Sequence, residues 1–203
     1  VENQTGIGTI TATDDDGDTL SFSLSGTDAS SMSINSSSGV LVFDSAPDYE
    51  TKTSYSATVT ASDGTNSTTQ DITITITDID DTAPVFTSSA SFSAAENQTS
   101  IGTVTATDVD TDNASITFSI SGSELAITSG GVLTFASTPD YETKSSYSAT
   151  VTASDGTNSS TQDITVTVTN VNDNSPVFTS GAAFSVVENQ TGIGTITATD
   201  DDG

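Results

Sequence analysis

The chain repeats itself at a nearly constant interval, and this constrains its fold more than any other feature of the sequence. The first 17 residues, VENQTGIGTITATDDDG, recur unchanged at 187–203, and a variant copy begins at Ala95. PDYETK recurs from 47–52 to 139–144, a spacing of 92 residues, and SYSATVTASDGTNS recurs at the same spacing. A period of this length indicates one domain type in tandem.

The repeat also sets the expected domain boundaries. We expect a domain at 1–81 with its first strand truncated, a complete domain at 82–173, and the start of a third at 174–203. Near its start the first copy carries the longer stretch SGTDASSMSINSSSG, where the second has SGSELAITSGG. Because the third piece holds only two expected strands, it should not close a core by itself.

Within each repeat, apolar residues alternate with Ser and Thr, as in Tyr55, Ala57 and Val59 or in Ile72, Ile74 and Ile76. Such alternation predicts half-buried antiparallel strands. In the middle repeat we expect seven strands, near 85–94, 101–107, 116–121, 125–128, 132–135, 146–154 and 162–171. The pattern predicts an all-β fold of tandem seven-stranded Greek-key β-sandwiches with immunoglobulin-like architecture.

The composition excludes several functions and raises one rival to a folded chain. There are 28 acidic and 2 basic residues, a formal net charge of -26, and no Cys, His or Trp. Without Cys or His, the chain can form no disulfide, no Cys/His zinc site and no Ser-His-Asp triad. With two basic residues, it is not expected to bind nucleic acid. No apolar run is long enough to span a bilayer. High charge with few large apolar residues is also typical of disordered chains, but the strict alternation favours a folded one.

The acidic residues cluster at strand ends, turns and the junctions between repeats. Five of the six Glu residues occupy just two positions of the repeat, the Glu-Asn pair and the DYE segment. Two carboxylates about 4 Å apart repel by roughly 4 kcal/mol at an effective dielectric constant near 20. Two lysines cannot neutralise such clusters, and a dense set of oxygen ligands favours Ca²⁺ over Mg²⁺.

At this point the sequence resembles the cadherin repeat, in its bacterial cadherin-like form. Glu2 and Glu96 match the xEx motif of that family, and DYE at 48–50 and 140–142 matches its DRE motif with Tyr in place of Arg. Residues 170–176, NVNDNSP, match the DxNDNxP linker with Asn for its first Asp, and residues 78–84, DIDDTAP, match it less closely. The DxD motif is matched at 108–110 and 200–202.

The resemblance implies up to three Ca²⁺ ions at each junction, shared by consecutive repeats. For the first junction it nominates the side chains of Glu2, Asp48, Glu50, Asp80, Asp81, Asp108, Asp110 and Asp155, and the carbonyls of Ile79, Thr82 and Asn113. For the second it nominates Glu96, Asp140, Glu142, Val171, Asn172, Asp173, Asn174, Asp200 and Asp202. Asp14, Asp16 and Asp63 would serve a junction with a preceding domain.

The remaining acids lie outside these motifs. We interpret six of them as solvated or turn residues: Asp15, Asp28, Asp44, Asp112, Glu124 and Asp201. Asp71 and Asp163 occupy strands and receive no role from the sequence.

Three functional hypotheses follow. The first is a calcium-rigidified spacer in an extracellular or cell-surface adhesion protein, a large secreted bacterial adhesin, whose partners are Ca²⁺ and the neighbouring repeats. The alternative is a recognition module for homophilic or glycan binding, with an unknown adhesion partner. The chain offers no Trp for it, and its aromatic residues, such as Phe22, Phe43, Tyr55 and Phe118, fall on expected core positions. The third, a glycosidase using paired carboxylates, is disfavoured because those carboxylates belong to metal motifs, so we expect no enzyme and no direct membrane insertion.

Overall fold

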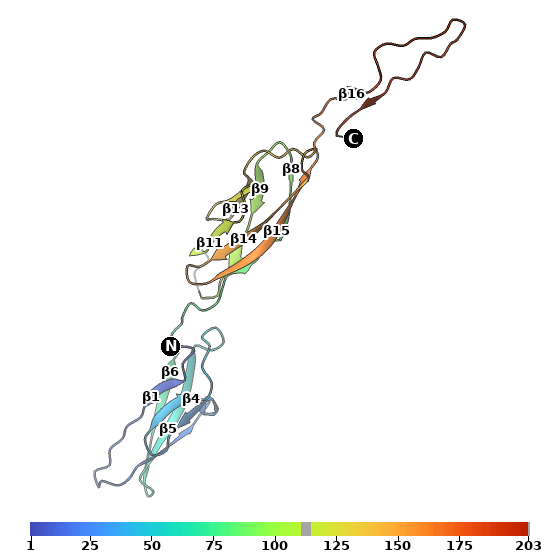
Figure 1. The fold of residues 1–203 in the computed structure, drawn as a ribbon. Coiled ribbons are helices and arrows are strands. Elements are labelled where there is room, and N and C mark those ends of the chain that lie inside the picture. The colour runs from blue at the N-terminus through green and yellow to red at the C-terminus, as the bar shows by residue number, and fades with distance from the viewer. Residues whose placement is uncertain (111–114, 203) are drawn as a thin grey trace. The chain divides into compact units, whose positions relative to one another are not determined.

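The computed structural model describes residues 1–110 and 115–202 (Figure 1). The chain divides into two compact units, Val1–Asp81 and Thr82–Gly203. The further division of the second unit at residue 174 stays a prediction. In the described part of the chain, no helix has the length and hydropathy needed to cross a bilayer.

The second unit contains two main β-sheets that face each other across one core. The four-stranded sheet has the order β11-β14-β15-β8, and the three-stranded sheet has the order β12-β13-β9. The strands are β8 (Ser91–Ala95), β9 (Ser100–Thr103), β11 (Thr117–Ile120), β12 (Leu125–Ile127), β13 (Val132–Phe135), β14 (Ser146–Ser154) and β15 (Ser159–Thr169). All pairs in these two sheets are antiparallel except β15 with β8, which run parallel from Thr165↔Ser91 to Thr169↔Ala95.

The core of this unit follows from the alternation in its sequence. In β15, Ile164, Val166 and Val168 are buried while the residues between them are exposed. The opposite sheet contributes Leu133 and Phe135, and these residues belong to one buried cluster. Fully burying such a side chain stabilises a fold by about 1.5–3 kcal/mol. The all-β sandwich predicted from the sequence is confirmed.

The first unit repeats this plan with two three-stranded sheets, β1-β4-β3 and β2-β5-β6. Its strands are β1 (Gly6–Thr9), β2 (Ser21–Ser25), β3 (Met32–Ile34), β4 (Val40–Phe43), β5 (Ser54–Ser62) and β6 (Ser67–Thr75), with a short 3-10 helix, η1, at Ala29–Ser31. Phe22 and Phe43 are buried, and Tyr55 packs against the core, as does Phe118 in the second unit. The core positions predicted for these aromatic residues are therefore confirmed.

Two predicted strands of the middle repeat are each divided in the structure. The expected strand at 85–94 is β7 (Val85–Phe86) followed by β8, and the one at 101–107 is β9 followed by β10 (Ala106–Thr107). The described residues of 82–173 thus form nine strands where the sequence predicts seven. Strand β7 pairs with β10, whereas β8 pairs with β15 in a different sheet. The alternation is interrupted by three polar residues at 87–89, and the change of partner falls there.

The segment after residue 174 has little regular structure. Two short strands, β16 (Val177–Phe178) and β17 (Ala198–Thr199), pair antiparallel. Large apolar side chains are exposed along this segment, including Phe178 and Val187. The end of the segment nevertheless contributes a carboxylate to the site described below.

Candidate metal centre

The candidate site of the second unit is organised by Glu96, the residue that follows β8. Its side chain is only 3% exposed. Oε2 accepts a hydrogen bond of 2.7 Å from the backbone N–H of Tyr141, and Oε1 accepts one of 2.7 Å from the backbone N–H of Val171. The carboxylate therefore joins the end of β8 to the DYE loop and to the linker that follows β15.

Asn97 makes the turn that sends Glu96 inward. Its φ of 62° lies in the left-handed region, which Asn tolerates better than most residues. Its backbone N–H donates to the carbonyl of Pro139 over 3.1 Å, and its side-chain amide donates to Oδ2 of Asp173. In the Glu-Asn pair, Glu96 therefore binds the DYE loop and the linker, and Asn97 orients Asp173 of the linker.

Four carboxylates meet at this end of the unit. Glu96, Glu142, Asp173 and Asp202 each offer one oxygen, and these oxygens all lie within 4.8 Å of one another. Desolvation raises the pKa of Glu142, and the nearby charges of Glu96 and Asp202 add to this effect. Desolvation acts in the same direction on Asp202, but hydrogen bonds from Asn174 outweigh it and leave the pKa of Asp202 lowered.

The DxD motifs adopt one local geometry at both places where the resemblance finds them. The backbone N–H of Asp202 donates to Oδ1 of Asp200 over 3.1 Å, and the N–H of Asn174 donates to Oδ2 of Asp202 over 2.6 Å. Asp110 donates likewise to Asp108 over 2.9 Å, and Thr82 donates to Asp110 over 2.6 Å. In both places the linker is therefore fixed to the second Asp of the motif.

Asp155 shows a buried oxygen that a cation would suit. Its Oδ1 accepts 2.6 Å hydrogen bonds from the backbone N–H groups of Thr157 and Asn158. Its Oδ2 is buried and has no hydrogen-bond partner among the residues that the structure describes. Buried carboxylate oxygens normally have a polar or charged partner, so this atom would suit a bound cation.

The first unit repeats the arrangement around Glu2, which is 1% exposed. Its carboxylate accepts backbone hydrogen bonds from Tyr49 and Ile79, at 2.8 and 2.7 Å. One oxygen each from Glu2, Asp48 and Glu50 lie within 4.8 Å of one another. Asn3 has a φ of 58°, and its amide donates to Asp81, as that of Asn97 does to Asp173.

Several other predicted ligands lie outside these two carboxylate groups, and their role as ligands stays a prediction. Asp140 accepts hydrogen bonds from the N–H and hydroxyl of Thr143, at 3.1 and 3.0 Å, so its carboxylate stabilises the DYE turn. Ile79, Thr82 and Val171 contribute N–H groups, and the carbonyl roles expected of Ile79 and Thr82 stay predictions. Asp80, which is half-buried, and Asn172, which is exposed, belong to neither carboxylate group. Asn113 lies outside the described residues.

The donor set fits a hard divalent cation. Every side-chain ligand in the two groups is a carboxylate, and the sequence supplies no thiolate or imidazole. Each lysine of the chain is engaged elsewhere: Lys52 pairs with Asp28, and Lys144 pairs with Glu124. Flexible coordination by many oxygens is the chemistry of Ca²⁺.

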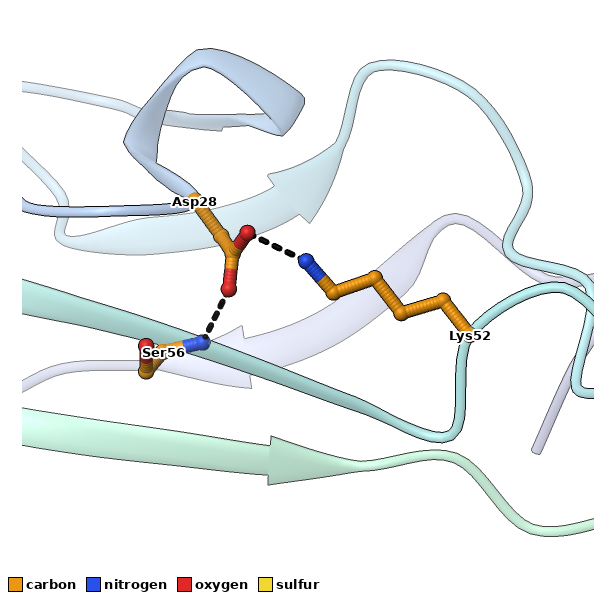
Figure 2. Close-up of polar contacts among 3 residues, drawn as sticks. All are labelled: Asp28, Lys52 and Ser56. Carbon is orange, nitrogen blue, oxygen red and sulfur yellow. Dashed lines mark hydrogen bonds and ion pairs between the residues drawn. The ribbon is translucent and has the colours of Figure 1, made fainter.

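Asp28 lies in a turn and Glu124 is exposed, as the sequence interpretation expects of solvated or turn residues, but each also pairs with a lysine, which the sequence did not predict. Figure 2 shows Asp28 between the ammonium of Lys52 and the backbone N–H of Ser56, which donates to Oδ2 over 2.8 Å. The hydrogen bond from Lys52 lowers the pKa of Asp28, and the one from Ser56 adds to the shift. The lysine at the same position of each repeat signals that an acidic partner exists, but it does not identify which acid that is.

The two acids without a predicted role have simple partners across the sheet. Asp71 accepts a 2.6 Å hydrogen bond from the hydroxyl of Thr58, and Asp163 accepts a 2.7 Å bond from that of Thr150. Both contacts join neighbouring strands, β5 with β6 and β14 with β15. They belong to the outer faces of the sheets and not to the candidate metal centres.

Together, the fold and the sites define a class of protein: tandem β-sandwich modules with carboxylate groups at their ends. The chain belongs to the cadherin family, whose Cadherin domain model matches residues 89–169. Its repeats are those of adhesion proteins. The expectation of a bacterial form gains no support from the relatives described next.

Two curated relatives illustrate the similarity. The chain is 36% identical to human protocadherin Fat 4 over 207 residues, covering 93% of this chain and 4% of that protein. It is 31% identical to human protocadherin-15 over 199 residues, covering 92% of this chain and 10% of that protein. The chain therefore spans a small fraction of the length of the relatives it matches.

Solved structures agree with this assignment. Mouse cadherin-23 EC22-24 matches with a TM-score of 0.74 and 28% identity, over 98% of this chain and 73% of that one. The protocadherin gammaB7 EC3-6 cis-dimer structure matches with a TM-score of 0.75 and 28% identity, over 94% of this chain and 54% of that one.

Proposed function

We propose that the chain is a calcium-stiffened spacer in the extracellular part of an adhesion protein. The observation that carries this proposal is the group of Glu96, Glu142, Asp173 and Asp202, in which four carboxylates meet without a lysine. Asp202 comes from the segment after residue 174, whereas Glu96 and Glu142 come from the preceding sandwich. A cation held by this group would therefore join the sandwich to the segment that follows it.

The roles of the individual residues follow from their contacts. Bound Ca²⁺ would supply the positive charge that these carboxylates share. Glu96 holds the DYE loop and the linker together through its two backbone hydrogen bonds. Asn97 and Asn174 orient Asp173 and Asp202 by donating to their carboxylates, at 2.6 Å from the Asn174 N–H to Asp202. The cluster around Glu2, Asp48 and Glu50 would take the same cation in the first unit.

The near identity of the repeats supports a spacer over a recognition module. A unique binding face would appear in one copy only, whereas long stretches such as 54–67 and 146–159 are identical. Most of the aromatic residues that a glycan site would expose pack in or against the cores, and the exposed ones are Tyr141, Phe178 and Phe184. Absence of catalytic activity stays a prediction.

Thermal unfolding tests the calcium site. We expect a higher unfolding temperature in millimolar calcium than in excess chelator, and a much smaller rise with magnesium. At a free calcium concentration about 100 times the dissociation constant, binding stabilises the fold by about 2.7 kcal/mol. Identical melting curves in calcium and chelator would contradict the proposal.

Small-angle scattering tests the spacer role separately. If calcium stiffens the junctions, the distribution of interatomic distances should narrow and its maximum should rise when calcium is added. A scattering profile that chelator leaves unchanged, in a protein whose melting temperature does respond to calcium, would retain the metal site and refute the stiffening.

A further inference from the structure

The only two basic side chains of the sequence occupy the same position of the repeat, at the end of PDYETK. The ammonium of Lys144 lies 2.5 and 2.7 Å from the two carboxylate oxygens of Glu124, and that of Lys52 contacts Asp28. Neither acid belongs to the carboxylate groups of the candidate metal centres. Each lysine lies in the loop next to a candidate metal centre, but its ammonium group binds an acid outside that centre.

Each lysine is also held over an aromatic ring of the core. Lys52 Nζ lies 4.6 Å from the ring centroid of Tyr55, and Lys144 Nζ lies 4.5 Å from that of Tyr147. The tyrosines in turn pack edge-on against Phe43 and Phe135, with centroid distances of 4.8 and 5.1 Å. Through this stack the lysine side chain is connected to the buried centre of its sandwich.

The two repeats build this contact from different loops. Backbone hydrogen bonds place Ser31 and Glu124 at equivalent positions, because Ser31 accepts from Asp44 at 3.0 Å and Glu124 from Ala136 at 2.9 Å. The acid of the first repeat, Asp28, comes from earlier in the chain, just before η1. The same lysine–acid–tyrosine contact thus persists although the loop differs in length and sequence, so the contact is not an accident of one loop.

The lysine closes the loop that carries the proposed ligands. Its backbone N–H donates over 2.9 Å to the carbonyl of Asp48 in the first repeat and of Asp140 in the second. We propose that Lys52 and Lys144 are positioning residues, which tether the DYE loops to the cores and so hold Glu50 and Glu142 in place for the cation. This inference rests on the proposed function for its ligand, but the tether itself can be tested without calcium.

Charge and tethering predict opposite effects of removing the lysine. A lysine near a cation site repels the cation, so Lys144→Met would tighten calcium binding if charge alone mattered, and Glu124→Gln would weaken it. If the tether matters, both variants loosen the same loop and both weaken binding. The double variant should then bind no more weakly than either single variant, because the contact is lost only once.

The experiment compares these three variants with the wild-type chain by NMR, following the backbone amides of Tyr141 and Val171 during a calcium titration. Both amides donate to Glu96 and so report on the second site. From typical exposed ion-pair and cation–π energies we expect binding weakened about three- to tenfold in each variant. Lys52→Met, in the other unit, is the matched control and should leave the second site unchanged. Tighter binding by Lys144→Met, or no change in both single variants, would overturn the proposal.

Hydrogen exchange supplies the calcium-free readout. In chelator, the amides of Tyr141 and Thr143, which donate to Glu96 and Asp140, should exchange faster in Lys144→Met and in Glu124→Gln than in the wild type. Unchanged exchange in both would refute the tether. If the wild-type amides do not respond to calcium, the proposed function fails, and the exchange rates still decide whether the tether exists. If Lys144→Met does not fold, Glu124→Gln keeps the lysine and its ring contact, and the hydrogen exchange of that variant in chelator decides whether the tether exists.

Discussion

Replacing Asp173 by Asn should have opposite effects on the Ca²⁺-free and Ca²⁺-bound forms. The Asp173 carboxylate lies within 4.8 Å of oxygens from Glu96, Glu142 and Asp202. At that separation each repulsion costs about 0.9 kcal/mol even with the dielectric constant of water, so before screening by salt the three together cost at least about 2.6 kcal/mol. The uncharged amide of the Asp173→Asn variant would remove this cost in the absence of calcium.

Part of this gain is offset by a lost hydrogen bond. Asp173 accepts from the amide of Asn97 and, at 3.0 Å, from the amide of Asn174, and an Asn side chain in its place can accept only one of these. A lost hydrogen bond costs about 0.5–1.5 kcal/mol. We therefore expect the calcium-free variant to be more stable than the wild type, by about 1–2 kcal/mol or more at low ionic strength. With calcium the variant loses a charged ligand, and a tenfold loss of affinity corresponds to about 1.4 kcal/mol.

The assay is thermal or urea unfolding of both proteins, in chelator and in millimolar calcium, at low and high sodium chloride. For a domain of this size, 1 kcal/mol shifts the melting temperature by about 4–8 °C. Asp163→Asn is the matched control, since it removes the same charge outside the carboxylate group, and its amide oxygen can still accept the 2.7 Å hydrogen bond from Thr150. A loss of stability by Asp173→Asn that is equal in chelator and in calcium would refute the reasoning, because the carboxylate would then act only as a hydrogen-bond acceptor.

Three further predictions concern the backbone and the pH dependence of stability. Asn97 has a φ of 62°, so Asn97→Gly should cost the turn little, whereas Asn97→Ala should lower the free energy of unfolding by about 1–2 kcal/mol more. Urea unfolding of the two variants measures this difference. Equal unfolding midpoints would contradict the expected backbone strain. Gly131→Ala should cost about 3 kcal/mol or more, because φ is +86° and the new Cβ would lie 2.2 Å from the carbonyl oxygen of Val104, whereas Gly130→Ala, with nothing closer than 3.9 Å, should be nearly neutral. The lowered pKa of Asp28 means that its contribution to stability is present above the unfolded value, near 3.8, and is lost as the pH falls through the lower folded value. Asp28→Asn should therefore flatten the acid limb of the stability curve of the first unit, and an unchanged acid limb would contradict this.

Much of the fold could be predicted because it depends on local alternation. The strands expected at 146–154 and 132–135 have those bounds in the structure. The alternation did not separate β7 from β8, because apolar residues recur at even positions on both sides of the polar residues 87–89, although the hydrogen-bond partners change there. The partner of a strand also depends on the sequence of that partner, so a single stretch of sequence does not determine how it pairs.

The candidate site shows a similar limit. Motif spacing identified Glu96, Glu142, Asp173 and Asp202, which the structure brings together. Asp140 accepts hydrogen bonds from Thr143, as Asp48 does from Thr51, so these contacts do not distinguish a turn residue from a ligand and the ligand role of Asp140 stays a prediction. Motif spacing could not find the partners of the lysines, because Asp28 and Glu124 occupy different positions in loops of different length.

The parallel pairing of β8 with β15 has a mechanical consequence. One of these strands lies at the beginning of its repeat and the other at its end, and they share five paired positions, from Ser91 to Ala95 on β8. Tension transmitted through the chain pulls the two strands in opposite directions along their axes, so the hydrogen bonds between them are loaded together in shear. An antiparallel hairpin pulled at its open end would instead release its bonds one after another. Because resistance to forced unfolding depends on the height of the unfolding barrier, this pairing suits the second unit to bear load.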